Sequence, residues 1–463
     1  MPELDRRDFL KLVGVGAGTA AAACAEPVEK LVPYVIQPED VTPGVASYYA
    51  STCTECPASC GIVVKTREAR PIKLEGNAEN PINRGSLCAR GQASLGRTYH
   101  PDRIPGPSAR GGDNTLQPIT WEEGMTQLTS ALRQSSGKTY ILGAPVGPSL
   151  SGVIDNLAEA AGAQRVVYEP FSNDALRSAT EALFGIRSLP LFDPGKADLI
   201  IDMGSDFLST GMSPCENARQ YADARNAQTH PDGGTRMIAI SPRLDSTTQS
   251  SDEWIAAGTG SQGAIAFALA RAVYDKRGVP EGVDASAVES FLSGVSLAQA
   301  AAQADVDPAQ LQGVAKALLS AESPLVMPPG VANTDSSAAA TATAVMLINL
   351  MTGAVGRSIQ VPPAPAGPQA ASQSEIESLV KEMKAGHVDV LLVHDSNPVY
   401  SMPDALGFQE ALSRVGTVVS FATLKDETSE ASTLVLPSHA NMEAWGDMAP
   451  RPGVRSLIQP TVR

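Results

Sequence analysis

Four cysteines lie close enough in the sequence to ligate one metal centre. They are Cys53, Cys56, Cys60 and Cys88, in the pattern C-x2-C-x3-C-x27-C. Cysteines only two or three residues apart make a poor disulfide framework because the bridge would be strained, whereas thiolates at these spacings can wrap a polynuclear centre. The pattern therefore predicts an iron–sulfur cluster, with a four-thiolate zinc site and an extracytoplasmic disulfide pair as the alternatives.

Two further residues bear on this centre. Arg90 lies two residues after Cys88, where a cation would stabilise a reduced and therefore more negative cluster; an ordinary surface arginine is the alternative. Cys215, in the sequence Ser-Pro-Cys-Glu, has no partner at a ligating spacing and is expected to be a buried apolar side chain.

The sequence around the cysteines predicts a small module of strands and loops. Residues 61–66 and 70–75 have the pattern of two short strands joined by a polar turn. The turn-rich stretch 77–85 then brings the chain back and delivers Cys88. Three ligands would therefore come from one loop, and the fourth from a separate loop.

Beyond residue 105 the pattern changes to alternating strands and helices. Short, almost continuously apolar runs predict strands, and the Ala-rich amphipathic stretches between them predict helices. This alternation predicts α/β domains built on parallel sheets. The predicted strands lie at 139–143, 165–168, 198–204, 236–241, 325–327, 388–393 and 417–420, and the predicted helices at 121–132, 150–161, 263–274 and 338–350.

The composition of the 463 residues is that of a folded, acidic protein. Apolar residues make up 43% and the mean hydropathy is -0.06, which excludes a polytopic membrane protein. The 50 acidic and 35 basic residues give a formal charge of -15, so binding to nucleic acid is disfavoured. The glycine-rich turn at 258–263 is expected to begin a helix rather than to cradle a phosphate.

The N-terminus has the features of an export signal. Arg6 and Arg7 precede a short Gly/Ala-rich stretch, which is typical of a twin-arginine signal. Three alanines then precede Cys24, which predicts a lipoprotein box in which this cysteine becomes the lipidated N-terminus; an incidental thiol is the alternative. The protein is therefore expected on the extracytoplasmic (periplasmic) face of the cytoplasmic membrane.

From Tyr48 to the C-terminus the chain resembles the molybdopterin (bis-guanine dinucleotide) oxidoreductases. The four cysteines are followed by Ala-Arg-Gly, as in that family. Further motifs of the family occur in its order at 99–104, 119–123, 197–201, 240–243, 251–254, 394–398, 426–428 and 434–437. The resemblance implies that the four cysteines bind a 4Fe-4S cluster and that Arg90 lies between this cluster and a pterin.

Three departures from the family's pattern concern its molybdenum cofactor. The turn that binds guanine through an aspartate is here 258–263, which has no carboxylate. The stretch 169–175, where a Cys, Ser or selenocysteine would ligate molybdenum, has no cysteine. Ser172 and Asp174 are metal ligands by type, but Ser-Asn-Asp is expected to cap a helix. The chain stops at Arg463, so the family's C-terminal β-barrel domain is expected to be absent, and no molybdopterin is expected.

The segments 27–49 and 394–463 look like the molybdopterin-like iron–sulfur subunit of alternative complex III, or of the related menaquinone reductase complexes. This resemblance implies a cluster-bearing, non-catalytic electron-transfer or scaffold subunit of a membrane-bound quinol oxidoreductase. The implied partners are a separate multi-cluster ferredoxin-like subunit, a multi-span quinone-binding subunit and c-type cytochrome subunits. The alternatives are a catalytic polysulfide or thiosulfate reductase subunit with its last domain on another chain, and a purely structural module.

The predicted fold class is α/β, with a small N-terminal β-rich Fe-S module, two α/β domains with parallel sheets and no C-terminal β-barrel domain. Residues 1–24 are predicted to form the signal and 25–48 an extended linker. The cluster module is predicted at 49–105, joined by 426–463. One α/β domain is predicted from 106–144 together with 321–425, and the other from 145–320.

Overall fold

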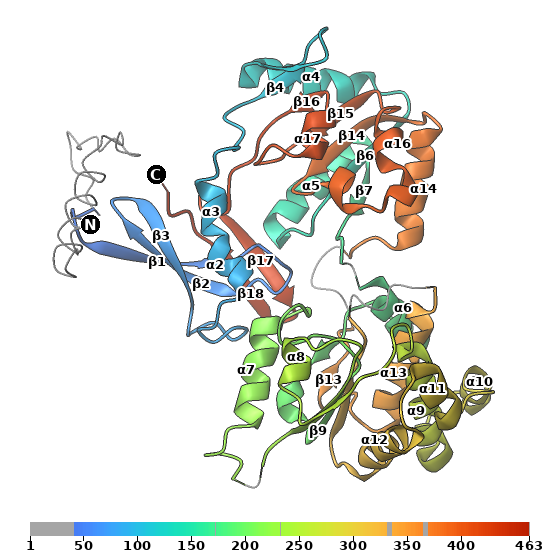
Figure 1. Cartoon of the computed structure of the whole chain (residues 1–463). Helices are drawn as coiled ribbons and strands as arrows, with labels where there is room; N and C mark the ends of the chain where they lie inside the picture. The colour runs from blue at the N-terminus through green and yellow to red at the C-terminus, as the bar shows by residue number, and fades with distance from the viewer. Residues whose placement is uncertain (1–40, 172, 232, 331–335, 364–368, 463) are drawn as a thin grey trace, which may run out of the picture. The chain divides into compact units, whose positions relative to one another are not determined.

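The computed structural model of the chain divides into two units, Met1–Val45 and Ala46–Arg463, and the elements considered below all belong to the second (Figure 1). The residues that it describes are 41–171, 173–231, 233–330, 336–363 and 369–462. Arg6, Arg7 and Cys24, on which the predicted signal and lipidation rest, lie outside these ranges. Over the described ranges, no helix combines the length and the apolar character that crossing a membrane requires.

An antiparallel three-stranded sheet forms the N-terminal module. Its strands, paired in chain order, are β1 (Ala46–Thr52), β2 (Gly61–Arg67) and β3 (Arg70–Gly76). Alternate residues of β2, Ile62 and Val64, are fully buried, as the period of two in a strand requires. β1 begins inside the predicted linker 25–48. Two short helices, α2 (Ala89–Ala93) and α3 (Leu95–Thr98), follow the loop that carries Cys88.

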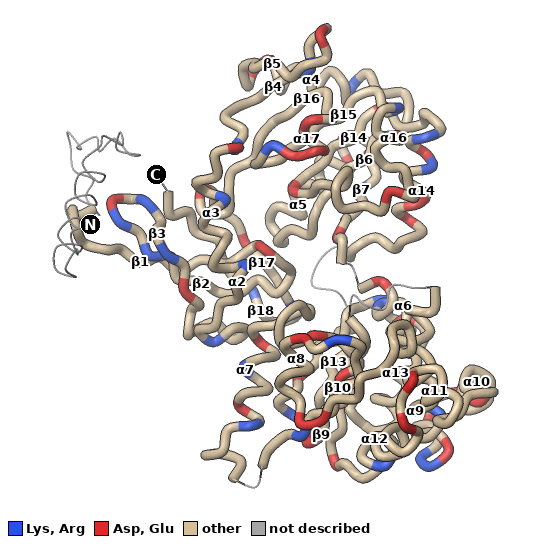
Figure 2. The backbone as a smooth tube through the Cα atoms, viewed as in Figure 1, with Lys and Arg blue, Asp and Glu red and all other residues tan. Residues whose placement is uncertain are grey.

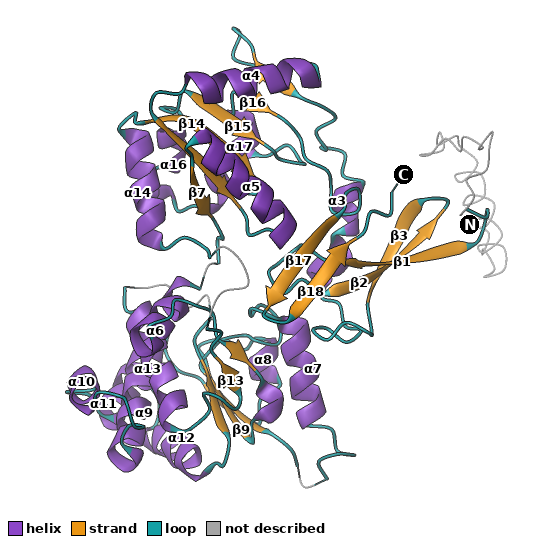
Figure 3. Ribbon diagram, turned by 180° about the vertical axis from the view of Figure 1, so that it is seen from behind, coloured by secondary structure: helices purple, strands orange, loops and turns teal. Residues whose placement is uncertain are grey.

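A hairpin from the C-terminal end of the chain lies beside this module (Figure 3). Its strands are β17 (Gly446–Arg451) and β18 (Val454–Ile458). The Thr52 hydroxyl donates to the Leu457 carbonyl at 2.8 Å, and the Gln459 amide donates to the Ser51 hydroxyl at 3.0 Å. The hairpin is therefore joined to the end of β1, directly before the first cysteine of the motif.

The larger of the two α/β sheets contains β4 (Ser108–Arg110), β5 (Leu116–Pro118), β6 (Lys138–Gly143), β7 (Gln164–Val167), β14 (Val388–His394), β15 (Thr417–Ser420) and β16 (Leu434–Val435). Their order is β5-β4-β16-β15-β14-β6-β7, and the five strands from β16 to β7 are parallel. Chain order reverses between β14 and β6. The carboxyl ends of strands at such a reversal are where open α/β sheets bind ligands.

Helices accompany this sheet along the chain. They are α4 (Trp121–Gln134), α5 (Pro148–Ala161), α14 (Gln373–Lys384), α15 (Pro398–Ser401), α16 (Phe408–Leu412) and α17 (Glu427–Ala431). Both α4 and α14 begin with a capping box, formed by Thr120 with Glu123 and by Ser372 with Glu375. The reciprocal hydrogen bonds satisfy backbone amides that the first turn would otherwise leave without partners, and so fix where each helix starts.

The second α/β sheet contains β9 (Leu199–Asp202), β10 (Arg236–Ile240), β11 (Glu253–Ile255) and β12 (Pro324–Met327). All four are parallel, in the order β11-β10-β9-β12, and a separate pair is formed by β8 (Leu191–Phe192) and β13 (Ile359–Gln360). Every residue of β9 and β12 is buried, as expected for a parallel sheet covered on both faces. The helices of this part are α6 (Asp174–Phe184), α7 (Pro214–Ala224), α8 (Ser246–Gln249), α9 (Gln262–Arg277), α10 (Ala285–Phe291), α11 (Leu297–Ala304), α12 (Pro308–Ser320) and α13 (Ala338–Met351).

The division of the chain between the two sheets differs from the prediction. β7 lies within 145–320 but pairs with β6 in the larger sheet, and β12 lies within 321–425 but pairs with β9 in the smaller sheet. β16, within 426–463, also belongs to the larger sheet. An apolar run indicates a buried strand but not its neighbour, because strand pairing depends on contacts between residues far apart in the sequence.

A bidentate ion pair links the start of the α/β region to the C-terminal segment. The Arg103 guanidinium donates to both carboxylate oxygens of Glu443, at 2.6 and 2.5 Å, and the side chains are 28% and 17% exposed. We expect Arg103→Lys, which keeps the charge but loses the fork of donors, to lower the free energy of unfolding by about 2 kcal/mol in urea denaturation. Lys73→Ala, in an exposed ion pair, is the control and is expected to cost less than about 1 kcal/mol. Equal losses in the two variants would contradict the prediction.

Candidate metal centre

Five cysteine side chains share one small core. Cys53, Cys60 and Cys215 are buried in it, and Cys56 and Cys88 pack against it half-buried. The buried residues Ala58, Ile62, Val64, Leu74 and Met442 belong to the same core. All five cysteines are free thiols. The structure thus brings the four cysteines of the motif together and adds a fifth, Cys215, that sequence spacing did not connect with them.

The loop between β1 and β2 carries three of these thiols. The Cys53 amide donates to the Cys60 carbonyl at 2.8 Å, which closes the loop at its base. Within the loop, Ser59 has a positive φ of 47°, and its amide donates to the Cys56 carbonyl at 3.2 Å. The backbone therefore turns sharply between the second and third cysteines, which lets residues so close in sequence share one core.

Asn83 ties the loop that carries Cys88 to strand β2. Its side chain donates to the Gly61 carbonyl at 2.9 Å and accepts from the Gly61 amide at 3.0 Å, in a buried environment. Gly61 must be a glycine, because a Cβ atom there would lie 2.5 Å from the Asn80 side chain. The turn-rich stretch predicted to deliver Cys88 is therefore fastened directly beside the Cys60 end of the first loop.

Burial makes the thiols of Cys53 and Cys56 weaker acids than usual. It raises the pKa of Cys53 to about 12 and also raises the pKa of Cys56, where the Arg90 guanidinium opposes the rise. Since metals bind thiolates, loading a metal centre into this core must displace the protons that the Cys53 and Cys56 thiols hold at neutral pH. Arg90 itself is exposed, but its charge acts on both Cys56 and Cys215, so the guanidinium lies near the thiols.

Cys215 reaches the core from the N-terminal end of helix α7. Its thiol is buried in the same core as Cys60, and Cys88 packs against that core. The contact with Cys60 couples the two thiols, so that the pKa of Cys215 falls while that of Cys60 rises. The expectation that Cys215 is buried is confirmed, and the structure adds that it shares a core with the cysteines of the motif. No local pattern could have shown this, because α7 lies far along the chain from the motif.

The donors in this core fit an iron–sulfur cluster. They are sulfur atoms from two loops, set in a largely apolar environment, and cysteine thiolates are the usual ligands of such clusters. Cys53, Cys56, Cys60 and Cys88 would hold it. Among the residues that the structure describes, no group of three or more His, Cys, Asp or Glu side chains is drawn together closely enough to hold a single metal ion.

Two polar atoms at the carboxyl end of β14 are buried without a hydrogen-bond partner. They are Nδ1 of His394 and Oγ of Ser396. Burial lowers the pKa of His394, so its ring is neutral at neutral pH. These atoms lie where the strand order reverses between β14 and β6, and they fit a polar ligand that would supply the missing hydrogen bonds.

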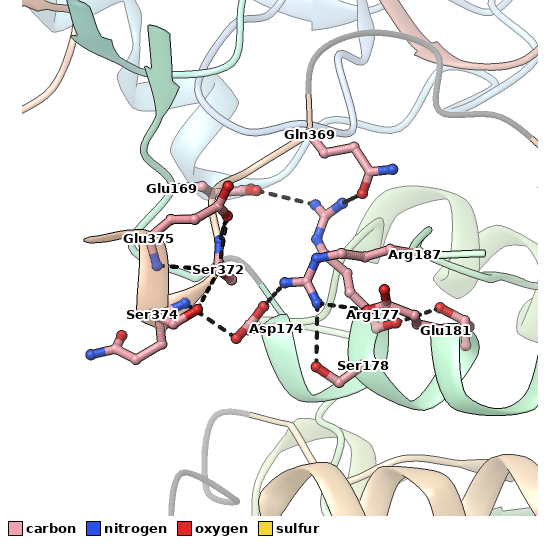
Figure 4. Close-up of polar contacts among 12 residues, drawn as sticks. Glu169, Asp174, Arg177, Ser178, Glu181, Arg187, Gln369, Ser372, Ser374 and Glu375 are labelled. Atoms are coloured by element: carbon pink, nitrogen blue, oxygen red, sulfur yellow. Dashed lines mark hydrogen bonds and ion pairs between the residues drawn. The ribbon is translucent and has the colours of Figure 1, made fainter. Parts of the chain in front are cut away.

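The stretch 169–175, where the resemblance places a molybdenum ligand, leads into a buried ion pair (Figure 4). Arg177 of α6 lies 3.7 Å from the Glu169 carboxylate, and these side chains are 10% and 14% exposed. Arg177 also donates to the Gln369 side chain at 3.3 Å. Burial raises the pKa of Glu169, and the charge of Arg177 opposes that rise. The stretch therefore offers a carboxylate already paired with a cation, and no sulfur ligand.

The residues of this stretch that are metal ligands by type have other roles or are not described. Asp174 pairs with Arg187 and accepts from the Gln373 amide at 3.3 Å, which connects α6 with the start of α14. Ser172 lies outside the described residues. The predicted capping is wrong for Asn173, which stands at the N-cap position with a φ of 52° and makes no side-chain capping hydrogen bond.

The glycine-rich turn at 258–263 begins a helix, as predicted. Helix α9 starts at Gln262, and the Ser261 hydroxyl donates back to the Gly258 carbonyl at 2.6 Å. Ser261 and Gln262 are only 2% and 3% exposed, so these side chains face the protein interior. Neither this turn nor the stretch 169–175 has the groups that the resemblance requires for guanine and molybdenum, an aspartate in the turn and a cysteine in the stretch, although buried polar atoms without partners remain at the carboxyl end of β14.

Comparison with known proteins agrees with this geometry. The family model for molybdopterin oxidoreductase matches residues 103–449, and that for the molybdopterin oxidoreductase Fe4S4 domain matches residues 46–100. The chain is 26% identical to the menaquinone reductase, molybdopterin-binding-like subunit of Nitratidesulfovibrio vulgaris, over 98% of this chain and 68% of that protein. It is also 26% identical to the thiosulfate reductase molybdopterin-containing subunit of Salmonella typhimurium, over 71% of this chain but only 43% of that protein.

A solved structure shows the same fold. Acetylene hydratase from Pelobacter acetylenicus superposes with a TM-score of 0.74 over 89% of this chain and 66% of that one, at 11% identity. The predicted family and the predicted α/β fold class are therefore confirmed. The Fe4S4 match includes all four cysteines of the motif, which supports an iron–sulfur cluster over zinc. The chain belongs to the molybdopterin oxidoreductase family and carries that family's Fe4S4 domain.

Proposed function

We propose that this protein is a cluster-bearing electron-transfer subunit of a membrane-bound quinol oxidoreductase, resembling those of menaquinone reductase or alternative complex III, without a molybdenum centre of its own. The observation that carries the proposal is the packing of four motif cysteines into one apolar core, inside the stretch that matches an Fe4S4 domain. The relative that covers 98% of this chain supports the type of complex, since it is named as a molybdopterin-binding-like subunit of menaquinone reductase.

A 4Fe-4S cluster held by Cys53, Cys56, Cys60 and Cys88 would supply one-electron redox chemistry. The protein sets the conditions for it. The apolar core limits access of water, and the positive charge of Arg90 near Cys56 favours the reduced, more negative state. Because Cys56 and Cys88 are only half-buried, that side of the core is the one nearest to solvent and to an electron-transfer partner.

The partners that we propose are a separate multi-cluster ferredoxin-like subunit, a multi-span quinone-binding membrane subunit and c-type cytochrome subunits. The export signal predicted from Arg6 and Arg7 supports a place in an extracytoplasmic assembly, and the formal charge of -15 disfavours nucleic acid. Acidic and basic residues are interspersed along the described chain (Figure 2). Purification of the full chain from membranes in mild detergent is expected to retain these subunits.

The electron-transfer role is tested by adding a quinol to the purified complex and following the cluster by EPR spectroscopy. We expect the signal of a reduced 4Fe-4S cluster to appear, and we expect none from a Cys56→Ser variant. A cluster that is present, but that no quinol and no co-purified subunit can reduce or oxidise, would contradict the proposal.

A catalytic molybdopterin reductase subunit is the second candidate. The buried and unsatisfied atoms of His394 and Ser396 favour it, because they lie where α/β folds of this kind bind ligands. The similarity to a thiosulfate reductase subunit also favours it. A protein that contains neither iron nor molybdenum would instead be a purely structural module.

We predict that the mature N-terminus is acylated Cys24, which holds the protein on the extracytoplasmic membrane face. A single myristoyl chain binds membranes only marginally, with K of about 10⁴ M⁻¹, so two or three chains together with partner contacts are needed for stable attachment. Intact-mass measurement of the protein from membranes checks this, and Cys24→Ala is expected to abolish the lipid mass. A mature chain that starts elsewhere, or that carries no lipid, would show that the Ala-Ala-Ala-Cys sequence is coincidental.

A further inference from the structure

We propose that one face of the three-stranded sheet in the N-terminal module binds the surface of an anionic lipid bilayer. We call it the open face, and it carries Tyr48, Lys65, Arg67, Arg70 and Lys73. The proposal goes beyond the proposed function, because it needs neither a cluster nor a particular partner subunit. It gives a role to the side of β1, β2 and β3 that points away from the core of cysteines.

The two faces of this sheet differ in burial. Ile62 and Val64 of β2 are fully buried in the core that contains the cysteines. Because side chains alternate along a strand, Lys65 lies on the other face. The register places Tyr48 of β1 and Lys73 of β3 directly opposite Lys65, one on each side. Tyr48 is 62% exposed, and its ring centre lies 5.9 Å from the Lys65 ammonium nitrogen, so the open face carries an aromatic ring beside cations.

Like charges stand opposite each other twice on the open face. The register pairs Lys65 with Lys73 and, at the end of the hairpin, Arg67 with Arg70. Cations directly opposite each other on two strands destabilise a sheet. Glu75 offsets one of the four, since its carboxylate lies 2.9 Å from the Lys73 ammonium. An anionic surface placed against this face would offset the repulsion in both pairs.

The charge of the N-terminal module differs in sign from that of the rest of the chain. Residues 46–100 contain seven basic and four acidic side chains, whereas residues 101–463 contain 24 basic and 39 acidic ones. Within the hairpin of β2 and β3, the acidic residues are Glu68 and Glu75, against the four cations of the open face (Figure 2). An anionic surface therefore attracts this module and repels the remainder of the protein, which orients the chain on it.

Two features favour a bilayer over an acidic protein as the partner. An exposed tyrosine beside lysines and arginines is typical of the membrane–water interface, where the ring lies at the level of the headgroups and the cations meet lipid phosphates. The second feature is position in the chain, because β1 begins 22 residues after Cys24, the predicted site of acylation. Even fully extended, that length of chain spans only about 75 Å, so an acyl chain on Cys24 would keep the sheet within reach of the bilayer.

The experiment places a tryptophan on the open face and measures whether lipids reach it. Tyr48→Trp is compared with Tyr400→Trp, which changes a tyrosine that is 76% exposed in α15, beside the larger α/β sheet. Both are made in the full chain with Cys24→Ala, so that no acyl chain contributes to binding. The vesicles contain phosphatidylcholine and phosphatidylglycerol with brominated acyl chains, which quench tryptophan on contact. Relative to the parent chain, we expect the added fluorescence to be quenched in Tyr48→Trp and unchanged in Tyr400→Trp, and vesicles of phosphatidylcholine alone to quench neither.

A second comparison measures the contribution of charge. Lys65→Gln, added to the Tyr48→Trp chain, is expected to weaken binding to the anionic vesicles about fivefold at low salt, because each basic residue near an anionic bilayer contributes about that factor. Lys316→Gln removes the same charge from an exposed position of α12 and is the control, expected to leave binding unchanged.

Equal quenching at positions 48 and 400, or no quenching at either, would overturn the proposal, and so would equal loss of binding in Lys65→Gln and Lys316→Gln. Absence of quenching, together with loss of a co-purified subunit from the Lys65→Gln protein, would mean that the open face binds an acidic protein instead. Neither comparison uses iron or a quinol. A failure here therefore leaves the proposed electron-transfer function intact, and a protein without a cluster would leave this result intact.

Discussion

Replacing Cys56 with serine is expected to remove iron and sulfide from the protein together and to destabilise the module that runs from β1 to α3. A serine hydroxyl is a poor substitute for a thiolate, so the cluster would lose one of its four attachments. Besides its cysteines, the core of this module contains few apolar side chains. Five are buried, namely Ala58, Ile62, Val64, Leu74 and Met442, and the partly buried Leu87, Leu95 and Val462 pack against them. Binding of the cluster therefore contributes much of the module's folding free energy. Iron and acid-labile sulfide per chain, and resistance of the module to protease, measure the two effects.

Cys215→Ser is the matched control for this experiment, because it changes a thiol of the same core that is outside the motif. It is expected to retain iron, sulfide and protease resistance. Unchanged iron in Cys56→Ser would refute the assignment of the ligands. Equal loss from both variants would mean that any disturbance of the core releases the cluster, and would leave no special role for the motif.

The cluster module was predictable from the sequence because its structure is local. The strands predicted at 61–66 and 70–75 agree with β2 and β3 to within one residue at each end. The return of the chain at 77–85 was also indicated by its turn-forming residues, among which Asn83 makes the hydrogen bonds to Gly61. Alternation of side chains and turn chemistry depend on neighbouring residues, and both can be read from a short window of sequence.

The features that escaped prediction depend on residues far apart in the chain. The sequence predicts a buried strand at 325–327, but an apolar run does not specify which strand lies beside it, so its pairing with β9 could not be predicted. Cys215 is a similar case, because it joins the cysteines of the motif in one core although α7 lies far along the chain from them. The ion pair of Arg177 with Glu169 likewise forms only when α6 packs against the strand end before it.

The assembled complex is expected to contain iron but no stoichiometric molybdenum. The stretch 169–175, in which the resemblance places the metal ligand, has no cysteine, and its Glu169 carboxylate is buried and paired with Arg177. In the family, an aspartate of the guanine-binding turn makes a hydrogen bond to the base that contributes about 1.5–3 kcal/mol. This chain has no carboxylate in the turn, and the loss of that bond weakens binding of the nucleotide roughly tenfold or more. Here the buried Ser261 hydroxyl donates to the backbone of its own turn. The formal charge of -15 further opposes a polyanionic cofactor.

Metal analysis, combined with release of guanosine monophosphate by acid hydrolysis, separates the candidate functions. Iron without molybdenum and without guanosine monophosphate agrees with a non-catalytic electron-transfer subunit, and the same assay on a molybdenum enzyme from the same cells controls for cofactor supply. Stoichiometric molybdenum and guanosine monophosphate would make the protein a catalytic reductase subunit and refute the prediction. Guanosine monophosphate without molybdenum would mean that the protein still binds the nucleotide, with the unpartnered polar atoms of His394 and Ser396 as candidate contacts, but that the stretch 169–175 does not hold the metal.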